Sequence, residues 1–291
     1  MKKFIYSCGK EKLEISLDGP FVHTDSDLNS FSLAENTEKY PDTDGDEPIE
    51  TLYEARPISI SGYIRAESKY ELRELRHKLE RTFNGKDYGK LMYCCDHNKF
   101  YADVKADRPV GFGNIIGNMQ TFIIYLKIHD FYWKKYRNRF KGMEHIISTD
   151  RDLIRGEFQL PCVWTEIYTR KTVYNAGDVK TPPVISIIGT EGERPSGDYT
   201  ECGIDIINHS TGEHLLVKCD AFKGETLVID NTVPMIFLNG NDGLQYFDES
   251  DGSDFFDLQT GGNDIEIVNK CKDNTINVSL EFTEKYRSVP I

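Results

Sequence analysis

The sequence contains no long apolar run, and no stretch approaches the ~18 consecutive apolar residues that a membrane-spanning helix requires. Its beginning, MKKFIYSCGKEKLE, has no apolar core of the length found in secretory signal peptides. Both absences argue against insertion into a membrane and against export. We therefore expect a protein that is made and folded in a cytoplasm.

Paired or clustered cysteine motifs are also missing. The chain has seven cysteines, an odd number, and none of them forms a C-x-x-C pair, although Cys94 and Cys95 are adjacent. Neither a disulfide framework nor a zinc site is indicated by this spacing. We expect free, buried thiols in a reducing compartment.

The common catalytic motifs are absent as well. There is no H-E-x-x-H, no G-x-S-x-G, no phosphate-binding G-x-x-x-x-G-K-[ST] and no G-x-G-x-x-G that opens a helix. Gly111-Phe112-Gly113 is an isolated G-x-G that we place in a loop. The sequence therefore predicts no enzyme, no catalytic residue, no cofactor and no metal site.

Basic residues are scarce relative to acidic ones: 35 Lys and Arg stand against 48 Asp and Glu, for a net charge of −13. This balance argues against nucleic-acid binding as the main task, because such binding depends on Lys and Arg that neutralise phosphates. The run WKKYRNRFKG, residues 133–142, is a local exception. In an acidic chain, we interpret it as a patch that meets an acidic neighbour or as a solvated linker rather than as a nucleic-acid site.

The abundant carboxylates leave two site hypotheses open. One is a glycosidase, which needs two carboxylates about 5–9 Å apart in a cleft; its candidates are Asp248, Glu249, Asp251, Asp254 and Asp257. The other is an irregular calcium site in that stretch or in Asp42-x-Asp44-Gly45-Asp46. In both stretches the glycine stands out of step with an EF-hand loop. A solvated acidic face is the more ordinary interpretation of either stretch.

Two further sets of side chains are candidate binding groups. His209 and His214 flank a turn and could face each other, but two ligands do not make a metal site. Exposed aromatics of the second half could stack on sugars; the candidates are Tyr199, Tyr246, Phe247, Phe255 and Phe256. Aromatic side chains in strands are more often part of a core.

The residues that are present favour two folded domains. The composition is 38% hydrophobic and 12% aromatic, and 291 residues is about twice a typical ~150-residue domain. In the first half, strands alternate around one helix predicted over residues 68–84, with Ser68 and Glu71 as a capping box. The polar, acidic residues 23–50 predict an exposed loop.

The second half is predicted to be entirely β. The turn signals at residues 175–183, NAGDVKTPP with its proline pair, mark the start of this domain. Short apolar segments separated by turns then follow at ~8–12-residue spacing, as in a sandwich or jelly roll. The predicted strands are 184–188, 203–207, 214–217, 226–229, 235–238, 254–258, 264–268 and 275–282.

The order of several short motifs resembles that of a known family. These motifs are Arg56–Gly62, Asp130–Trp133, Phe158–Pro161, Asn175–Asp178, Thr181–Ile187, Ile207–Glu213, Gly224–Asp230, Leu238–Gly240 and Phe255–Ile265. Together they resemble the distal tail proteins of long-tailed bacteriophages and of tail-like bacteriocins, over roughly residues 50–282. Phe131 stands where that family usually has a proline. The acidic stretch 25–50 has no counterpart in the motif series.

The resemblance implies a mainly β protein: an α+β ring-forming domain at 1–135, a connecting segment at 136–173 and a galectin-like β-sandwich at 174–291. It implies a homohexameric ring that binds the tail tube protein on one face and tail-tip or baseplate proteins on the other. The location implied is the virion tail, after assembly in the bacterial cytoplasm. The alternative from another functional class is a carbohydrate-binding adhesin that acts through the second domain.

Overall fold

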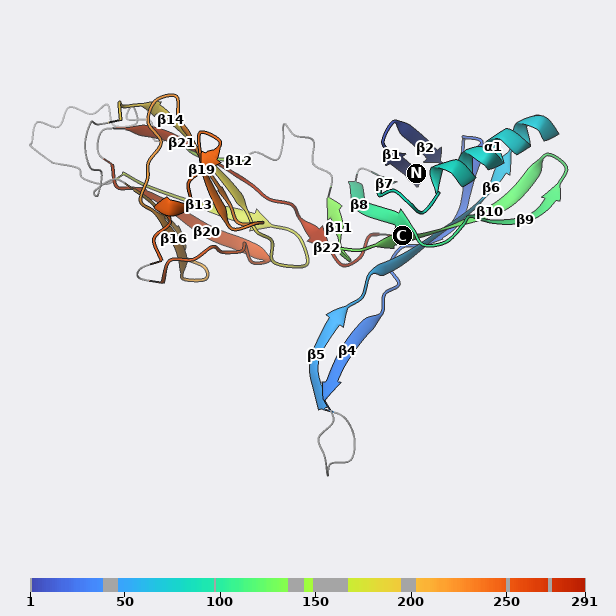
Figure 1. Cartoon of the computed structure of the whole chain (residues 1–291), viewed down its shortest axis with the longest axis horizontal. Coiled ribbons are helices and arrows are strands. Elements are labelled where there is room, and N and C mark those ends of the chain that lie inside the picture. Colours follow the sequence, from blue (N-terminus) through green and yellow to red (C-terminus); the bar gives the residue numbers. More distant parts are fainter. Residues whose placement is uncertain are drawn as a thin grey trace, which may run out of the picture. The chain divides into compact units, whose positions relative to one another are not determined.

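The computed structural model divides into two compact units. The first comprises Met1–Tyr136 with Tyr286–Ile291, and the second comprises Arg137–Lys285 (Figure 1). The structure describes residues 2–38, 47–96, 98–135, 144–148, 167–194, 203–249, 252–271 and 274–290.

The first unit is built around one large antiparallel sheet with the order β2-β1-β7-β8-β10-β6-β3. Three short strands attach to it: β9 to β10, β11 to β8, and β22 to β11. Two further strands, β4 and β5, form a sheet of their own. The elements are β1 Lys3–Cys8, β2 Glu11–Ile15, β3 Phe21–Asp27, β4 Leu33–Glu38, β5 Glu47–Tyr53, β6 Arg56–Arg65, α1 Lys69–Thr82, β7 Gly89–Cys95, β8 Asn98–Ala106, β9 Gly111–Ile116, β10 Met119–Ile128, β11 Trp133–Lys135 and β22 Lys285–Tyr286.

The central pair β6 and β10 shows why the sheet forms. Alternate residues of each strand are buried, so one face of the pair is apolar. The register places Ile58 opposite Leu126 and Ile60 opposite Ile124, which aligns the two buried rows. These rows form the middle of a core that also includes Trp133, a side chain with no exposed surface.

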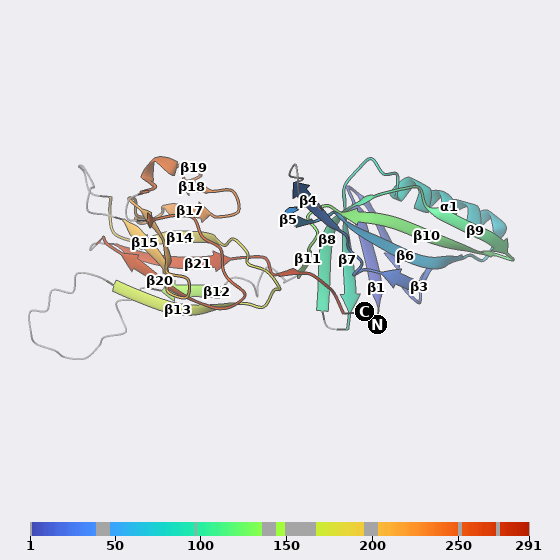
Figure 2. The ribbon, with the colours of Figure 1, turned by 90° about the horizontal axis from the view of Figure 1, so that it is seen from below.

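Helix α1 begins and ends close to where the sequence places it. Ser68 is the N-cap, and its hydroxyl accepts a hydrogen bond from the Glu71 amide at 3.1 Å. The Glu71 carboxylate accepts from the Glu67 amide at 2.7 Å, one residue before the position expected for a capping box. Leu72 and Leu79 are buried, so one stripe of the helix packs on the core. Figure 2 shows α1 running beside β9 and β10.

The prediction of an exposed loop over residues 23–50 is wrong. β3 continues to Asp27, and Leu33–Glu38 pairs antiparallel with Glu47–Tyr53 as a hairpin. We call the two strands β4 and β5 of this pair the acidic hairpin. Its strands are mostly exposed on both faces, so the alternation of buried and exposed residues that identifies a strand in a sequence is absent.

The second unit is a sandwich of two antiparallel sheets, as predicted. One sheet has the order β12-β21-β14-β17-β18-β19 and the other β13-β20-β15-β16, and Figure 1 shows them as two layers. The strands are β12 Glu144–Ser148, β13 Ile167–Asn175, β14 Val184–Glu191, β15 Ile204–Asn208, β16 Glu213–Val217, β17 Thr226–Asp230, β18 Met235–Leu238, β19 Asn241–Asp242, β20 Gly261–Asn269 and β21 Thr275–Glu281. A short 3-10 helix spans Leu244–Tyr246.

One continuous apolar core joins the two layers of the second unit. Ile185 and Ile187 of β14 are fully buried, as are Ile204 and Ile206 of β15 on the opposite sheet. Each strand contributes every second residue, which is the pattern of an aligned sandwich. The mainly β fold class predicted from the sequence is therefore confirmed.

The sandwich begins earlier than the turn at residues 175–183. β12 and most of β13 lie inside the expected connecting segment 136–173, yet the two strands pair with β21 and β20. The turn itself links β13 of one sheet to β14 of the other. Asn175 closes it, because its side chain accepts from the Gly177 amide at 3.0 Å and donates to the Val179 carbonyl at 3.0 Å.

Two other expectations fail in the second half. Residues 254–258, predicted as a strand, make only a single bridge between Leu258 and Thr181. The final residues, Tyr286–Ile291, belong to the first unit instead of the sandwich. Val289 lies in the first unit's core, and the Tyr93 hydroxyl donates to the Pro290 carbonyl at 2.9 Å.

Within the described residues, no helix is long and apolar enough to cross a membrane. The cysteines of that part of the chain are free thiols: Cys219 and Cys271 are buried, and Cys8, Cys94 and Cys95 are half-buried.

Candidate functional site

The acidic stretch proposed for glycoside hydrolysis does not form a carboxylate pair among its described members. Asp248 makes an ion pair with Lys218 at 2.7 Å, and Asp257 makes one with Lys180 at 3.0 Å. The Asp254 carboxylate accepts from the Phe255 amide at 2.7 Å and thereby holds its own loop. Glu249 is exposed, and Asp251 lies outside the described residues. Asp248, Asp254 and Asp257 are thus each held by a separate contact.

No group of three or more potential metal ligands occurs within the described residues. The hypothetical calcium loop at Asp42, Asp44 and Asp46 lies outside them. The two histidines contact carboxylates and not each other: His209 contacts Glu266, and His214 Nδ1 lies 3.1 Å from Asp205. A histidine pair across that turn is therefore not formed.

The aromatic residues predicted as candidates for sugar stacking pack into the second unit. Phe256 is 3% exposed and belongs to the core, and Tyr246, Phe247 and Phe255 pack against it. Phe247 and Phe255 contact each other, with ring centroids 5.1 Å apart. Tyr199 lies outside the described residues. The four described rings act as core residues, which is the more common role of aromatics in a β domain.

The described part of the basic run 133–142 is also occupied by structural contacts. Trp133 is buried, and Lys134 makes ion pairs with Asp103 at 3.1 Å and with Asp130 at 2.6 Å. Lys135 lies over the Tyr286 ring. The residues from 136 to 142 lie outside the described residues. In the described part of the run, Lys134 therefore contacts acidic neighbours, as the first of the two interpretations expects.

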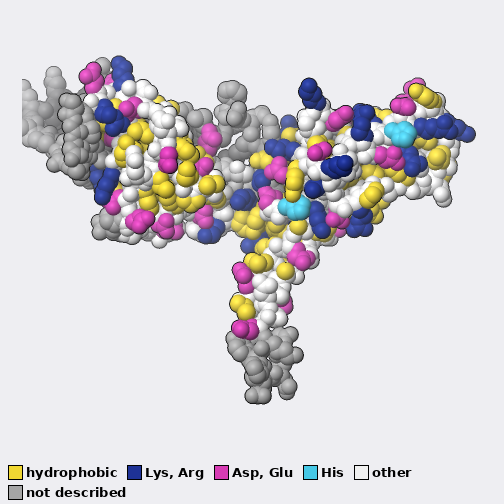
Figure 3. Space-filling model, viewed as in Figure 1, with side chains coloured by type: hydrophobic (Ala, Val, Ile, Leu, Met, Phe, Trp, Pro, Cys, Tyr) yellow, Lys and Arg dark blue, Asp and Glu magenta, His cyan; other side chains and the backbone are white. Residues whose placement is uncertain are grey.

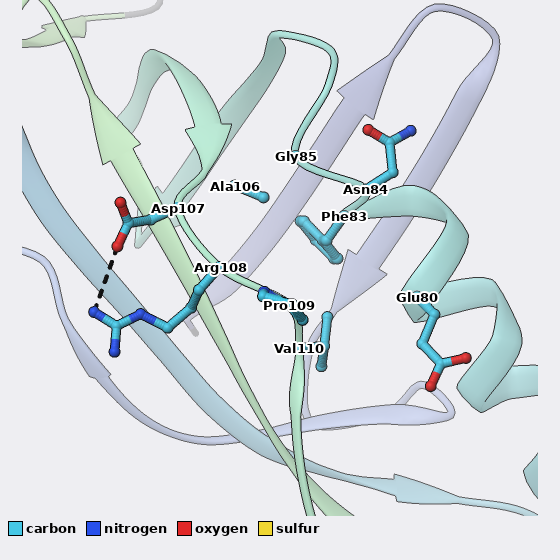
Figure 4. Close-up of a pocket in the computed structure, with 9 residues that line it drawn as sticks. All are labelled: Glu80, Phe83, Asn84, Gly85, Ala106, Asp107, Arg108, Pro109 and Val110. Atoms are coloured by element: carbon cyan, nitrogen blue, oxygen red, sulfur yellow. Dashed lines mark hydrogen bonds and ion pairs between the residues drawn. The ribbon is translucent and has the colours of Figure 1, made fainter.

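A pocket of ≈ 590 Å³ lies between the end of α1 and the connection from β8 to β9 (Figure 4). On the rim of this pocket, the Asp107 carboxylate makes ion pairs with Lys127 at 3.2 Å and with Arg108 at 3.4 Å. The hydrogen bond from Lys127 holds the Asp107 pKa below its ordinary value. A carboxylate kept ionised in this way is suited to an ion pair and poorly suited to proton transfer near neutral pH.

A groove of ≈ 330 Å³ lies between α1 and the β9–β10 pair. Its lining is cationic and apolar, formed by Lys69, Leu72, Arg73, Arg76, Ile115 and Gln120. The guanidinium of Arg76 lies over the Phe112 ring, 4.5 Å from its centroid. The segment Gly111-Phe112-Gly113 was expected in a loop. It belongs instead to strand β9, which lies beside this groove. We call this feature the basic groove.

Sequence reasoning missed the buried polar groups that hold both units. Arg56 is fully buried in the first unit. In the second, several asparagines are buried: Asn175, Asn208, Asn231, Asn263, Asn269 and Asn274. Asn263, for example, donates to the Gln259 carbonyl at 2.8 Å and accepts from the Gln259 amide at 2.8 Å. An Asn beside a Gly or Asp in a polar stretch carries no sequence signal that separates a buried position from an exposed one.

The matches to known families follow the division into units. Residues 8–128 match the family model described as a phage tail protein RIFT-related domain. Residues 176–286 match the family model described as the siphovirus-type tail component, C-terminal domain. The chain belongs to the siphovirus-type distal tail protein family. It is a structural tail component, as the motif order indicated, and the carbohydrate-binding alternative is not favoured.

The solved structures add the likeness in fold. The crystal structure of the Dit protein of SPP1, described as a paradigm of the hub adsorption apparatus in phages that infect Gram-positive bacteria, is 13% identical. The match covers 97% of this chain and 98% of that chain, with a TM-score of 0.63. A chain of the phage P2 baseplate in its activated conformation with Ca is 12% identical, covers 99% of this chain and 100% of that chain, and has a TM-score of 0.46. No curated protein matches the chain.

Proposed function

We propose that this distal tail protein works by assembling into a closed ring, six copies around, at the end of a phage-type tail. The ring joins the tail tube protein on one face to the tail-tip or baseplate proteins on the other. The observation that carries the proposal is the tandem match: one tail-component model covers most of the first unit and a second covers most of the second. The likeness in fold to the SPP1 hub protein along nearly the whole chain supports it.

The two units have different tasks in this proposal. A ring is closed by heterologous contacts, in which two different patches of one subunit meet around the axis. The first unit supplies these patches. The second unit is a sandwich, and it supports the parts of the tail that contact the host.

The protein has no catalytic role in this proposal. Two of its candidate carboxylates, Asp248 and Asp257, are held in ion pairs with lysines. The net charge of −13 suits a ring through which DNA passes without binding, because like charges repel. The protein is thus neither a nucleic-acid-binding nor a membrane-inserted component, and it resides in the virion tail after assembly in the bacterial cytoplasm.

The experiment that tests this function is light scattering of the purified chain over a concentration series, with negative-stain images of the same samples. Closed rings of six copies, and rings capped by added tail tube protein, are the expected result. A chain that stays monomeric with and without the tube protein, and that labels a glycan array, would instead support an adhesin. Imaging of intact tails carrying a tagged copy then locates the ring at the tail end.

A further inference from the structure

The acidic hairpin is a poorly supported element in a single copy of the chain. Its two strands form a separate two-stranded sheet, and such a sheet alone in water is only marginally stable. Its contacts with the rest of the first unit are at its base, where the Tyr53 ring stacks on Phe131 with centroids 4.1 Å apart. Figure 1 shows the hairpin extending away from α1.

The hairpin exposes apolar side chains in register. Leu33 lies opposite Tyr53, and Ala34 lies opposite Leu52, so each face carries an apolar pair. Leu33, Ile49 and Leu52 are 49%, 66% and 47% exposed. Figure 3 shows hydrophobic and acidic side chains along its described part. An exposed apolar surface on a projecting element is typical of an interaction site.

The charge of the hairpin is of one sign. Its two strands contain four Glu and no Lys or Arg. Glu35 and Glu50 are exposed, one on each strand. The occupant of such a surface is expected to be basic and to have apolar side chains at its edge.

The basic groove has the complementary character. Three cations, Lys69, Arg73 and Arg76, line it, and none of its described lining residues is acidic. Its rim is apolar: Ile115 and Ile116 of β9 are 56% and 73% exposed. Figure 3 shows Lys and Arg side chains over α1, with Asp and Glu side chains among them.

Two further observations support an occupant. Gln120 lines the groove and is 4% exposed; its Nε2 donates to the Gly113 carbonyl at 2.9 Å, whereas its Oε1 has no partner among the described residues. A buried acceptor without a donor is costly, so this part of the groove lining is poorly satisfied in a single copy. The length of the hairpin strand also agrees with that of the helix beside the groove. The six residues of β4 extend ~20 Å, and the fourteen residues of α1 extend ~21 Å.

We propose that the acidic hairpin of one copy docks on the basic groove of a second copy of this chain. The contact joins two different patches, so it repeats head to tail and can close a ring. It rests on the proposed function and names the surfaces through which the ring assembles. Glu35 and Glu50 face Lys69 and Arg73, and the apolar pairs of the hairpin cover Ile115 and Ile116.

The test is photo-crosslinking between copies. A benzophenone amino acid replaces Leu52, and the labelled chain is mixed with ¹⁵N-labelled wild-type chain so that crosslinks between copies are separated from those within one. The expected crosslinks join residue 52 to peptides from 69–76 or 111–120 of the other copy. The same probe at Val233, which is 65% exposed in the second unit, is the control and should not reach those peptides.

Charge reversal makes the test specific. Arg73→Glu in the acceptor copy should lower the crosslink yield about tenfold, and Glu50→Lys in the probe copy should restore it. Lys78→Glu, on the same helix but outside the groove lining, should leave the yield unchanged. Crosslinks that map elsewhere, or none between copies, overturn the docking. Rings that form without these crosslinks refute only the docking, whereas groove crosslinks without rings refute only the proposed ring function.

Discussion

The side chain of Arg56 binds Phe131 twice: its Nε donates to the Phe131 carbonyl at 3.0 Å, and its guanidinium lies over the Phe131 ring, 4.2 Å from the centroid. The same guanidinium donates to the carbonyls of Leu28 at 3.3 Å and Arg287 at 2.5 Å. Burial lowers the Arg56 pKa from its ordinary value. One buried cation thus ties three distant segments of the first unit together through backbone carbonyls.

Replacing Arg56 by Leu should therefore destabilise the first unit by about 3–4 kcal/mol, because the carbonyls of Leu28, Phe131 and Arg287 lose a charged donor. Calorimetry of thermal unfolding measures this as a lower transition for the first unit with an unchanged second transition. Arg81→Leu is the matched control, since that side chain is 71% exposed and should change stability little. Equal effects of the two substitutions would contradict the role given to Arg56.

Asp220 is expected to make the stability of the second unit depend on pH. It is 1% exposed, and burial raises its pKa to about 6 from an ordinary 3.8. Because the folded-state pKa lies above the unfolded one, the folded unit gains stability as pH falls through 6, and this gain is complete below about 4. The total is about 3 kcal/mol.

Asp220→Asn removes this dependence while keeping an acceptor for the Ala221 amide, which the Asp220 Oδ1 accepts at 2.8 Å. We expect the variant to be more stable than the wild type at pH 7.5, by about 1–2 kcal/mol, and to lose that advantage near pH 4.5. Urea unfolding at the two pH values measures the difference. A difference that stays constant between them would show that Asp220 does not titrate in this range.

Gly189 lies where no other residue fits. A Cβ built there would lie 2.1 Å from the Phe222 carbonyl oxygen, which belongs to the backbone and cannot turn away. Gly189→Ala should thus cost the second unit about 3 kcal/mol through forced displacement of the chain. Gly243→Ala, whose Cβ would have its nearest neighbours at 3.4 Å, should cost far less in the same thermal unfolding measurement. A small effect at both positions would mean that the Phe222 backbone yields easily.

Removal of residues 286–291 should unfold or strongly weaken the first unit and leave the second intact. The deletion takes Val289 from the core and breaks the paired hydrogen bonds between Val289 and Asn29, at 2.9 and 3.0 Å. The expected loss is at least about 4 kcal/mol. Removal of Ile291 alone is the control. Limited proteolysis would show a protected second unit in the longer deletion; an equally protected first unit would refute the prediction.

The features that sequence predicted well carry local signals. The N-cap Ser68 and the spacing of Leu72 and Leu79 predicted α1 to within two residues at each end. The strands β14 and β15 are visible in the sequence as short apolar segments bounded by turn residues. The motif order then predicted the family, which two family models show.

The features that were missed depend on distant partners. β4 and β5 have no buried face, so their strand character comes only from pairing with each other. Phe256 is a core residue in an irregular loop, which the aromatic and apolar residues of 254–258 could not distinguish from a strand. In the sequence, Phe131 stands out only because the family usually has a proline there. Its φ of +65° is a conformation that the proline ring forbids, so the backbone at Phe131 follows a different path.

The chain leaves the first unit after β11 and returns to it as β22, and these two strands are neighbours in one sheet. The second unit is thus an insertion whose entry and exit share one location. Recombination between tail genes can replace such an insert without changing the path of the chain in the first unit. The new insert only has to match the distance between two adjacent strands. A short turn in place of residues 137–284 should likewise close the first unit. The architecture therefore allows the second unit to be exchanged while the first unit keeps its own sheet and core.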